Sequence, residues 1–381
     1  MSHFPVLVIG DDVEDQLAPF HEFECTGQDD QHVQELNETD DAWTAYCRHT
    51  DALVREDADH EWVSRFAPAC YREPTLTEAT EIGPLGGTGG NGKGLQWTSH
   101  DWDDGRGYRT QVHEVPAGWE EADLPTSERR SFPEFCVEWY DRALVAHGEE
   151  PDTEGEHKYG YTLVDEVGAV VKTVRRTNPN AQWDWYLVGG RWTGYFLLRD
   201  GGEGEVGEPG MRTRPAGPGR ADSALKRDVD VETMRVAAGA DAGALWDAVQ
   251  GVIAGREFTP WTAFLAELDA GKLSREEAAT SYREQPAVRD VTAWAFSAKT
   301  YLAADSGVWT TAREDYVQRA RDRALSVHAV VKDGTWHERG AMGSWAVVSD
   351  EVDPQEWETR LAELLDSLPD GARLTIVDCH I

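Results

Sequence analysis

The spacing of apolar positions changes several times along the chain, and each change predicts a different kind of element. Short apolar runs rich in β-branched and aromatic residues occupy 3–10, 161–174 and 184–198, and such runs are typical of strands. From residue 223 onward the apolar positions recur at helical spacing, as at Leu245 and Val249. The pattern therefore predicts strands in the first half of the chain and helices after them.

The C-terminal part returns to a strand pattern that one amphipathic helix interrupts. Asp333-Gly334 predicts a hairpin turn, and Asp370-Gly371 leads from the helix into a last strand. The order strand, strand, helix, strand is typical of an antiparallel sheet with a helix on one face. We therefore predict an α+β fold with a helical insertion, whose mostly antiparallel sheet is built from N-terminal, central and C-terminal segments.

Composition marks the expected domain boundaries. Residues 201–222 are polar, rich in Gly and Pro and without periodicity, which is typical of a flexible linker. On this basis residues 1–200 form an α+β domain around a central aromatic hairpin, and residues 223–327 form a helical block. Residues 328–381 form a ββαβ segment that completes the sheet of the first domain.

The charge balance limits the classes of partner. The chain has 71 acidic and 36 basic residues, a formal net charge of −35. Direct binding to nucleic acid is disfavoured, because phosphate contacts need clustered Lys and Arg. Residues 11–61 hold seventeen acidic residues and two arginines. A solvated acidic surface explains such a segment, and mimicry of a polyanion such as DNA is the alternative.

The cysteines and the apolar runs indicate a cytoplasmic protein. Five cysteines are scattered singly with no CxxC pair, which argues against a disulfide scaffold or a zinc knuckle. No apolar run reaches the length of a membrane span, and the first residues lack the basic region of a signal peptide. We therefore expect a cytoplasmic location and no membrane partner.

Two adjacent loops carry candidate chemistry. Residues 87–94 approach a P-loop, but Gly94 stands where a P-loop has Ser or Thr for magnesium, so we expect no ATP binding of this type. The next segment places Asp101 and Asp103 at a spacing that can hold magnesium, with Arg106 beside them. A solvated turn explains the same residues. We take Asp101 and Arg106 as candidate ligand-binding residues.

Two further segments combine histidine with carboxylates. His21, Glu22 and Glu24 lie near the N-terminus, and Asp378 and His380 share one face of the last predicted strand, because side chains alternate along a strand. Imidazole and carboxylate on one face can transfer protons or bind a transition metal. A plain hydrogen-bonded pair is the structural alternative. We take these five as candidate catalytic residues, and the need for a divalent metal stays open.

Residues 178–194, NPNAQWDWYLVGGRWTG, concentrate aromatic side chains around a Gly-Gly pair. Cross-strand aromatic packing explains such a hairpin. A ligand surface is the alternative, because aromatic faces stack on bases and an arginine after Gly-Gly can grip a phosphate. The candidate ligand-binding residues of this stretch are Trp183, Asp184, Trp185, Arg191 and Trp192.

Several blocks of the sequence resemble a group of proteins from actinobacteria and their phages to which no activity is assigned. The resemblance covers most of the chain and implies a phage or mobile-element setting, but no mechanism. The blocks that carry it are HFPVLVIG with LAPFHEFE, WTSHDWDDGRGY, NPNAQWDWYLVGGRWTG, WHERGAMGSW and TIVDCHI.

Two functions from different classes follow, and the sequence does not decide whether the chain is an enzyme. If the separated blocks converge in space, they form a pocket for a nucleotide-like, phosphate-bearing ligand that the protein hydrolyses or sequesters. If they do not converge, residues 11–61 favour an acidic interaction protein that mimics DNA and inhibits a basic, DNA-binding host protein.

Overall fold

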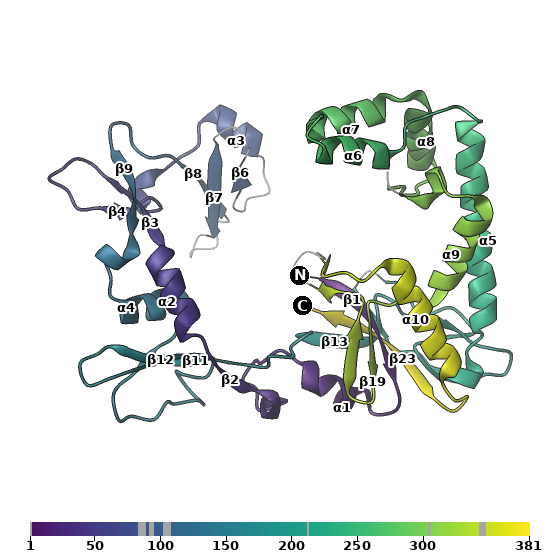
Figure 1. Ribbon diagram of the computed structural model, residues 1–381, viewed down its shortest axis with the longest axis horizontal. Coiled ribbons are helices and arrows are strands. Elements are labelled where there is room, and N and C mark those ends of the chain that lie inside the picture. Colours follow the sequence, from purple (N-terminus) through teal and green to yellow (C-terminus); the bar gives the residue numbers. More distant parts are fainter. Residues whose placement is uncertain are drawn as a thin grey trace. The chain divides into compact units, whose positions relative to one another are not determined.

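The chain forms two compact units. The computed structural model describes residues 2–82, 89–90, 95–101, 108–211, 213–303, 306–342 and 348–381. Unit 1 comprises residues 1–24, 29–32 and 178–381, and unit 2 comprises residues 25–28 and 33–177 (Figure 1). This division differs from the expected boundary at residue 200, because the chain crosses into unit 2 and returns from it before the aromatic stretch.

The main sheet of unit 1 is built from segments far apart in the sequence. Its strand order is β15 (Gly204–Glu205), β18 (Ser223–Leu225), β23 (Arg373–His380), β1 (His3–Ile9), β19 (Ala329–Lys332) and β20 (Thr335–Glu338), with β13 (Trp185–Gly190) also paired to β23. These pairings are antiparallel except for β1 with β19. The predicted α+β class, with a mostly antiparallel sheet and a helical insertion, is confirmed.

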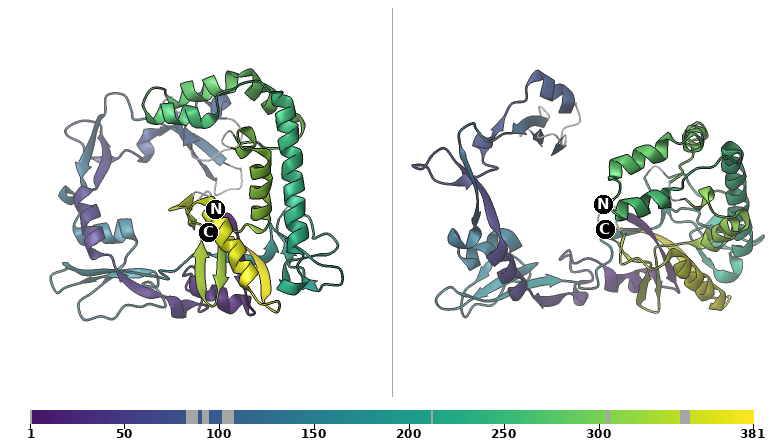
Figure 2. Two further views of the ribbon diagram at one scale, coloured as in Figure 1. Left: turned by 45° about the vertical axis from the view of Figure 1, so that its right-hand side comes forward. Right: turned by 45° about the horizontal axis from the view of Figure 1, so that its top comes forward.

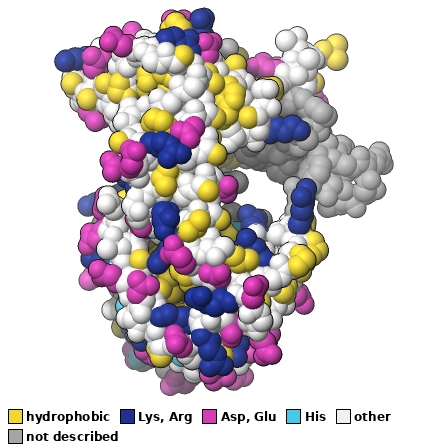
Figure 3. Space-filling model, turned by 90° about the vertical axis from the view of Figure 1, so that its right-hand side faces the viewer, with side chains coloured by type: hydrophobic (Ala, Val, Ile, Leu, Met, Phe, Trp, Pro, Cys, Tyr) yellow, Lys and Arg dark blue, Asp and Glu magenta, His cyan; other side chains and the backbone are white. Residues whose placement is uncertain are grey.

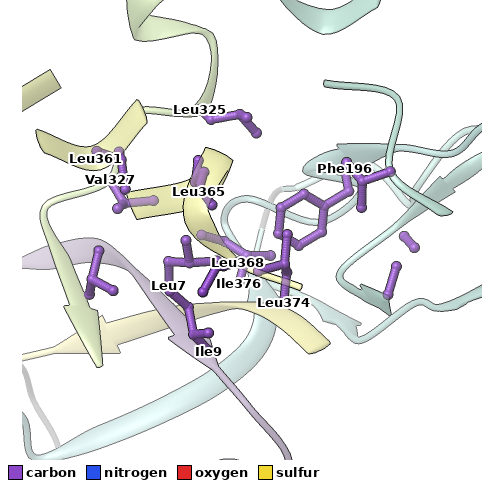
Figure 4. Packing of buried hydrophobic residues seen from close by; sticks show 14 of the residues in the cluster. Leu7, Ile9, Phe196, Leu325, Val327, Leu361, Leu365, Leu368, Leu374 and Ile376 are labelled. Carbon is purple, nitrogen blue, oxygen red and sulfur yellow. The ribbon is translucent and has the colours of Figure 1, made fainter. Parts of the chain in front are cut away.

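Both faces of this sheet are buried, because apolar side chains point to each face in turn along β1. Leu7, Leu374 and Ile376 lie on one face and pack against Leu361 and Leu365 of α10 (Pro354–Ser367) (Figure 4). Each fully buried side chain of this kind contributes about 1.5–3 kcal/mol. A one-residue slip of β1 would exchange its two faces, so burial fixes the register.

The opposite face is covered by the segment that follows β1. Val6 and Val8 pack there with Leu17, which ends α1 (Val13–Leu17), and with Phe20, which ends the 3-10 turn η1 (Ala18–Phe20). Trp183 joins this cluster, and its indole Nε1 donates to the carbonyl of Leu17 at 3.1 Å. Trp183, the first tryptophan of the aromatic stretch, is thus part of the core.

Residues 201–222 belong to unit 1 and do not connect two units. Short strands of this segment pair with its neighbours, and Asp222 ties the segment down from a fully buried position. The Asp222 carboxylate accepts the backbone N–H groups of Gly194 at 2.5 Å, Tyr195 at 3.2 Å and Gly207 at 2.9 Å. A Cβ at Gly207 would collide with the carbonyl of Val188. Close approach of two backbones, rather than flexibility, therefore explains at least this glycine. The strands concerned are β14 (Phe196–Leu197), β15, β16 (Glu208–Pro209) and β17 (Arg220–Ala221).

The helical block extends from the sheet of unit 1 along one long helix, α5 (Figure 2). Val249, Ile253, Val291 and Trp309 are among the buried side chains of its own small core. In the upper part of Figure 3, hydrophobic side chains gather on this block, with acidic and basic side chains between them. Its helices are α5 (Val231–Ile253), α6 (Trp261–Asp269), α7 (Arg275–Glu284), α8 (Pro286–Ser297) and α9 (Arg313–Asp322).

The described part of unit 2 contains three small sheets and three helices, of which α2 and α4 pack together. Tyr46 of α2 packs against Phe132 and Phe135 of α4, with ring centroids 5.3 Å and 5.4 Å away. The helices are α2 (Thr39–Arg48), α3 (Leu76–Ile82) and α4 (Phe132–Tyr140). The sheets are β10 (Leu144–Val145), β11 (Gly160–Val164), β12 (Val170–Thr177) and β2 (Gln34–Asn37); β4 (Val63–Ser64), β3 (Thr50–Arg55) and β9 (Glu120–Pro125); and β5 (Tyr71–Arg72), β8 (Tyr108–His113), β7 (Gln96–Asp101) and β6 (Gly89–Gly90).

β21 (Ala341–Met342) and β22 (Val348–Ser349) pair with each other in an antiparallel arrangement. Within the described part of the chain, every helix is too short or too polar to cross a membrane.

Asp222 should be a major determinant of stability. We expect Asp222→Ala to lower the free energy of unfolding by at least about 3 kcal/mol, because three buried backbone donors lose their acceptor. Urea unfolding measures this change, and the exposed Asp200 provides a matched control as Asp200→Ala. Equal stability of the two variants would show that the carboxylate does not hold this segment.

His328 should make unit 1 sensitive to acid. Burial, and then the nearby Arg339, lower the pKa of His328 from 6.5 to about 4. As the pH falls from about 6.5 to about 4, the unfolded chain binds a proton that the folded chain does not, so stability is lost, by up to about 3 kcal/mol. Unfolding of wild type and His328→Leu at pH 7 and pH 4.5 tests this. An identical acid-induced loss in both proteins would contradict the expectation.

Candidate functional site

Several of the candidate residues converge at one end of the main sheet. The pairing of β1 with β23 places His3 opposite His380, and the pairing of β13 with β23 places Trp185 opposite the same histidine. Residues directly opposite each other point to the same face. Asp378 lies two residues before His380 and therefore shares that face. Segments from the start, middle and end of the chain thus form one cluster, which we call the His–Asp cluster: His3, Asp184, Trp185, Asp378 and His380.

Two histidine–carboxylate pairs lie side by side in this cluster. The Nδ1 atom of His3 lies 2.9 Å from the Asp378 carboxylate, and Nδ1 of His380 lies 2.7 Å from the Asp184 carboxylate. The two imidazole rings face each other edge to face, with centroids 4.9 Å apart. Because a carboxylate only accepts hydrogen bonds, Nδ1 of each ring is the donor. Each carboxylate therefore fixes the orientation of one imidazole.

The Nε2 atoms are the chemically available atoms of this pair. In the described part of the chain, neither Nε2 has a hydrogen-bond partner. A neutral imidazole that donates through Nδ1 presents the lone pair of Nε2, and this is how a general base is held for proton transfer. His3 is 13% exposed and His380 6%. Both rings are thus largely desolvated.

Trp185 covers the two imidazoles on the outer side. Its ring stacks on His380 at a centroid distance of 5.0 Å and contacts His3 edge to face at 5.1 Å. The Trp185 side chain is nevertheless 41% exposed. One part of the indole therefore packs on the cluster while another part is open to solvent, where a planar ligand can stack on it.

His21 lies next to the cluster in a different chemical environment. Its Nδ1 contacts the Asp29 carboxylate at 3.1 Å, and its Nε2 contacts the backbone carbonyl of Asp184 at 3.0 Å. Its ring also stacks on the buried Trp183 at 4.3 Å. With both ring nitrogens engaged, His21 positions Asp184 and has no free nitrogen for proton transfer. This differs from the catalytic role expected for it.

The neighbouring residues of the aromatic stretch divide between core and surface. Trp192 packs against the core on the α10 side of the sheet, and Trp183 is 5% exposed. The Arg191 side chain is exposed, while its backbone N–H donates to Asp378 at 2.9 Å. That amide is consequently not available to an anion. Gly190 precedes it with φ 52°, and a Cβ there would collide with Asp378.

The remaining candidates lie outside the cluster. Glu22 and Glu24 are exposed, and the backbone N–H of Glu22 donates to the carbonyl of Trp183 at 2.7 Å. Asp101 ends β7 in unit 2, and its side chain, like all of Arg106, lies outside the described residues. The P-loop-like segment 87–94 also lies outside them, except for the backbone of Gly89-Gly90.

The acidic segment 11–61 does not form one surface of one unit. It contributes to both units, and several of its carboxylates pair with arginines. Asp11 lies 3.0 Å from Arg373, and Asp51 lies 3.1 Å from Arg129. These contacts offset part of the charge on which the DNA-mimic interpretation depends.

His3 is the residue of the site that sequence analysis missed. It was treated only as the first residue of a strand, and its partner Asp378 is 375 positions away. Among the described residues, no group of three or more His, Cys, Asp or Glu side chains is arranged to hold a metal ion. The two imidazoles with their carboxylates have the geometry of a proton-transfer site.

A scan of the chain against protein-family models, and searches of curated proteins and of solved structures, find no match, so the function is inferred from the chemistry of the cluster.

Substitutions in the aromatic stretch should separate packing from surface roles. We expect Trp183→Ala to cost about 3–5 kcal/mol of unfolding free energy, because it empties a buried site. Trp185→Ala should cost less than half as much, since that ring is partly exposed. Arg191→Ala retains the backbone N–H to Asp378 and should change stability by no more than about 0.5 kcal/mol. Denaturant unfolding of the three variants tests this order, and a reversed order would contradict it.

Proposed function

We propose that the protein hydrolyses a phosphoester bond in a small, nucleotide-like ligand by general acid–base catalysis. The observation that supports this most directly is the pair of imidazoles of His3 and His380, 4.9 Å apart, each held through Nδ1 by its own carboxylate. Two histidines with opposite protonation states can supply both the base and the acid that such a hydrolysis needs.

The proton balance of the reaction matches this arrangement. A neutral imidazole takes a proton from water as the water oxygen forms its bond to phosphorus. The second, protonated imidazole gives its proton to the leaving oxygen as the bond between that oxygen and phosphorus breaks. Asp378 and Asp184 fix the orientation of the His3 and His380 rings, respectively, and keep each Nε2 directed away from its carboxylate.

Two neighbouring side chains suit a nucleotide-like ligand. The exposed part of Trp185 offers a face for a planar base, and the exposed guanidinium of Arg191 follows the backbone amide that binds Asp378. The net charge of −35 disfavours a polymeric nucleic acid as substrate. The ligand class is therefore a small phosphate-bearing molecule.

The cytoplasm is the compartment in which we place this activity. All five cysteines are free thiols, and two of them, Cys25 and Cys47, are at least partly accessible. Accessible unpaired thiols are typical of reducing compartments. Small nucleotides, the proposed class of ligand, are also present in the cytoplasm.

The test is hydrolysis of bis(p-nitrophenyl) phosphate and of a panel of nucleoside phosphates by the full-length protein. We expect turnover with a bell-shaped pH dependence, because one imidazole must be neutral and the other protonated. His3→Gln and His380→Gln should each lower kcat about 10²- to 10⁴-fold. The exposed His337 provides the matched control as His337→Gln, which should retain full turnover.

Thermal unfolding of the same variants distinguishes this proposal from a purely structural pair of hydrogen bonds. Lost turnover with an unchanged melting temperature for His3→Gln supports proton transfer. If the wild-type protein binds nucleotides in equilibrium dialysis but hydrolyses none of them, hydrolysis is contradicted and sequestration of the ligand remains as the function. Equal turnover of wild type and both variants would exclude the His–Asp cluster as the site.

A further inference from the structure

A cavity lies away from the His–Asp cluster, between the end of α9 and the start of α10. Its volume is about 340 Å³, and it is lined by Arg319, Asp322, Arg323, Asp353 and Glu358, among others. This volume falls in the range of small-molecule sites. No step of the proposed hydrolysis uses these residues.

The buried charged group in the lining of the cavity is an incompletely bonded carboxylate. Glu358 is only 4% exposed, and its Oε1 accepts a hydrogen bond from the Ser326 hydroxyl at 2.6 Å. Its Oε2 is buried and has no partner within the described part of the chain. Burial raises the pKa of Glu358, as expected for a carboxyl group that lacks solvation. A buried polar atom without a partner is costly, by about 1–3 kcal/mol.

The cationic groups of the cavity are also unpaired. Arg319 and Arg323 lie one helical turn apart at its exposed rim, and neither forms an ion pair with any described residue. The two other carboxylates are already engaged. Asp353 caps α10 by accepting the N–H groups of Gln355 and Glu356, and Asp322 accepts from Gln318. The groups left for a ligand are therefore the two guanidinium groups at the rim and Oε2 of Glu358, the buried carboxylate oxygen of the lining that has no partner among the described residues.

We propose that this cavity binds a small zwitterion of the class of free α-amino acids. The carboxylate of the ligand meets Arg319 and Arg323 at the rim, and its ammonium group donates to Oε2 of Glu358 inside. Guanidinium groups suit carboxylates because their donors form a planar fork. The dianion of a phosphate monoester would satisfy the arginines but has no proton to donate to the Glu358 oxygen, and the negative charge of any phosphate would repel that carboxylate. The opposite charges of the cavity thus favour a ligand that carries both signs.

The experiment is a binding screen of the twenty amino acids against the full-length protein by ligand-observed NMR, followed by calorimetry of the strongest binder. We expect at least one amino acid to bind, and its N-acetyl and carboxamide derivatives to bind at least about tenfold more weakly, because each lacks one charge. Inorganic phosphate and a nucleoside monophosphate serve as the anionic probes and should not displace it.

Two pairs of variants place the binding in this cavity. Glu358→Gln and Arg323→Gln should each weaken affinity at least about tenfold. Glu363→Gln on the same helix and Arg283→Gln on α7 are exposed controls and should change it less than about twofold. If Glu358→Gln does not fold, the exposed Arg323 and the two blocked derivatives still decide the question.

Three results would overturn the proposal. The first is that no amino acid binds at millimolar concentration. The second is that the N-acetyl derivative binds as tightly as the free amino acid, since Glu358 would then have no role. The third is that phosphate or the nucleotide displaces the amino acid and itself binds more weakly to the Arg323→Gln variant, because the cavity would then be an anion site. None of these results depends on whether the His–Asp cluster hydrolyses phosphoesters.

Discussion

The antiparallel pairing of the first and last strands is the interaction on which unit 1 depends. β1 and β23 pair from His3 with His380 to Ile9 with Leu374, and the backbones of Ser2 and Ile381 continue the pairing by exchanging two hydrogen bonds. The entropy cost of bringing the two ends of the chain together rises only slowly with the length of chain between them. Each apolar pair that the register buries adds its own favourable free energy of burial. The same register sets the two imidazoles of the His–Asp cluster beside each other. One strand register therefore determines both the packing of the core and the position of the candidate site.

Buried carboxylates organise the surroundings of this sheet. Asp222 and Asp378 together accept four backbone N–H groups from the loops around β13 and β16, and Gly190 and Gly207 provide the space for the close backbone approach. Hydrogen bonds to a charged acceptor are stronger than those between neutral groups. Glycine-rich loops are usually flexible, but these hydrogen bonds hold the loops around β13 and β16 against the sheet. Asp378 has a double role, because it binds one loop and orients His3 at the same time.

The sequence was sufficient for the fold class and for one local feature of the candidate site. Alternation along the last strand correctly put Asp378 and His380 on one face, since that inference needs only local geometry. Partners such as His3 and Asp184 depend on strand register, which is set by packing of the whole sheet. The same limit explains residues 201–222: their composition is typical of a linker, and only the fold shows that Gly207 is required by contact with Val188. Composition likewise gave no sign that unit 2 interrupts unit 1, because both have similar strand patterns.

Asn178 marks the place where that interruption begins and ends in unit 1. Its side-chain amide donates to the carbonyls of Pro19 at 2.9 Å and His21 at 2.8 Å, so the departing and returning chain segments are joined there. Unit 2 is thus an insertion in unit 1, and the two segments of unit 1 that flank the insertion are adjacent to each other. We therefore expect changes of length within residues 33–177 to leave the sheet that carries the His–Asp cluster in place.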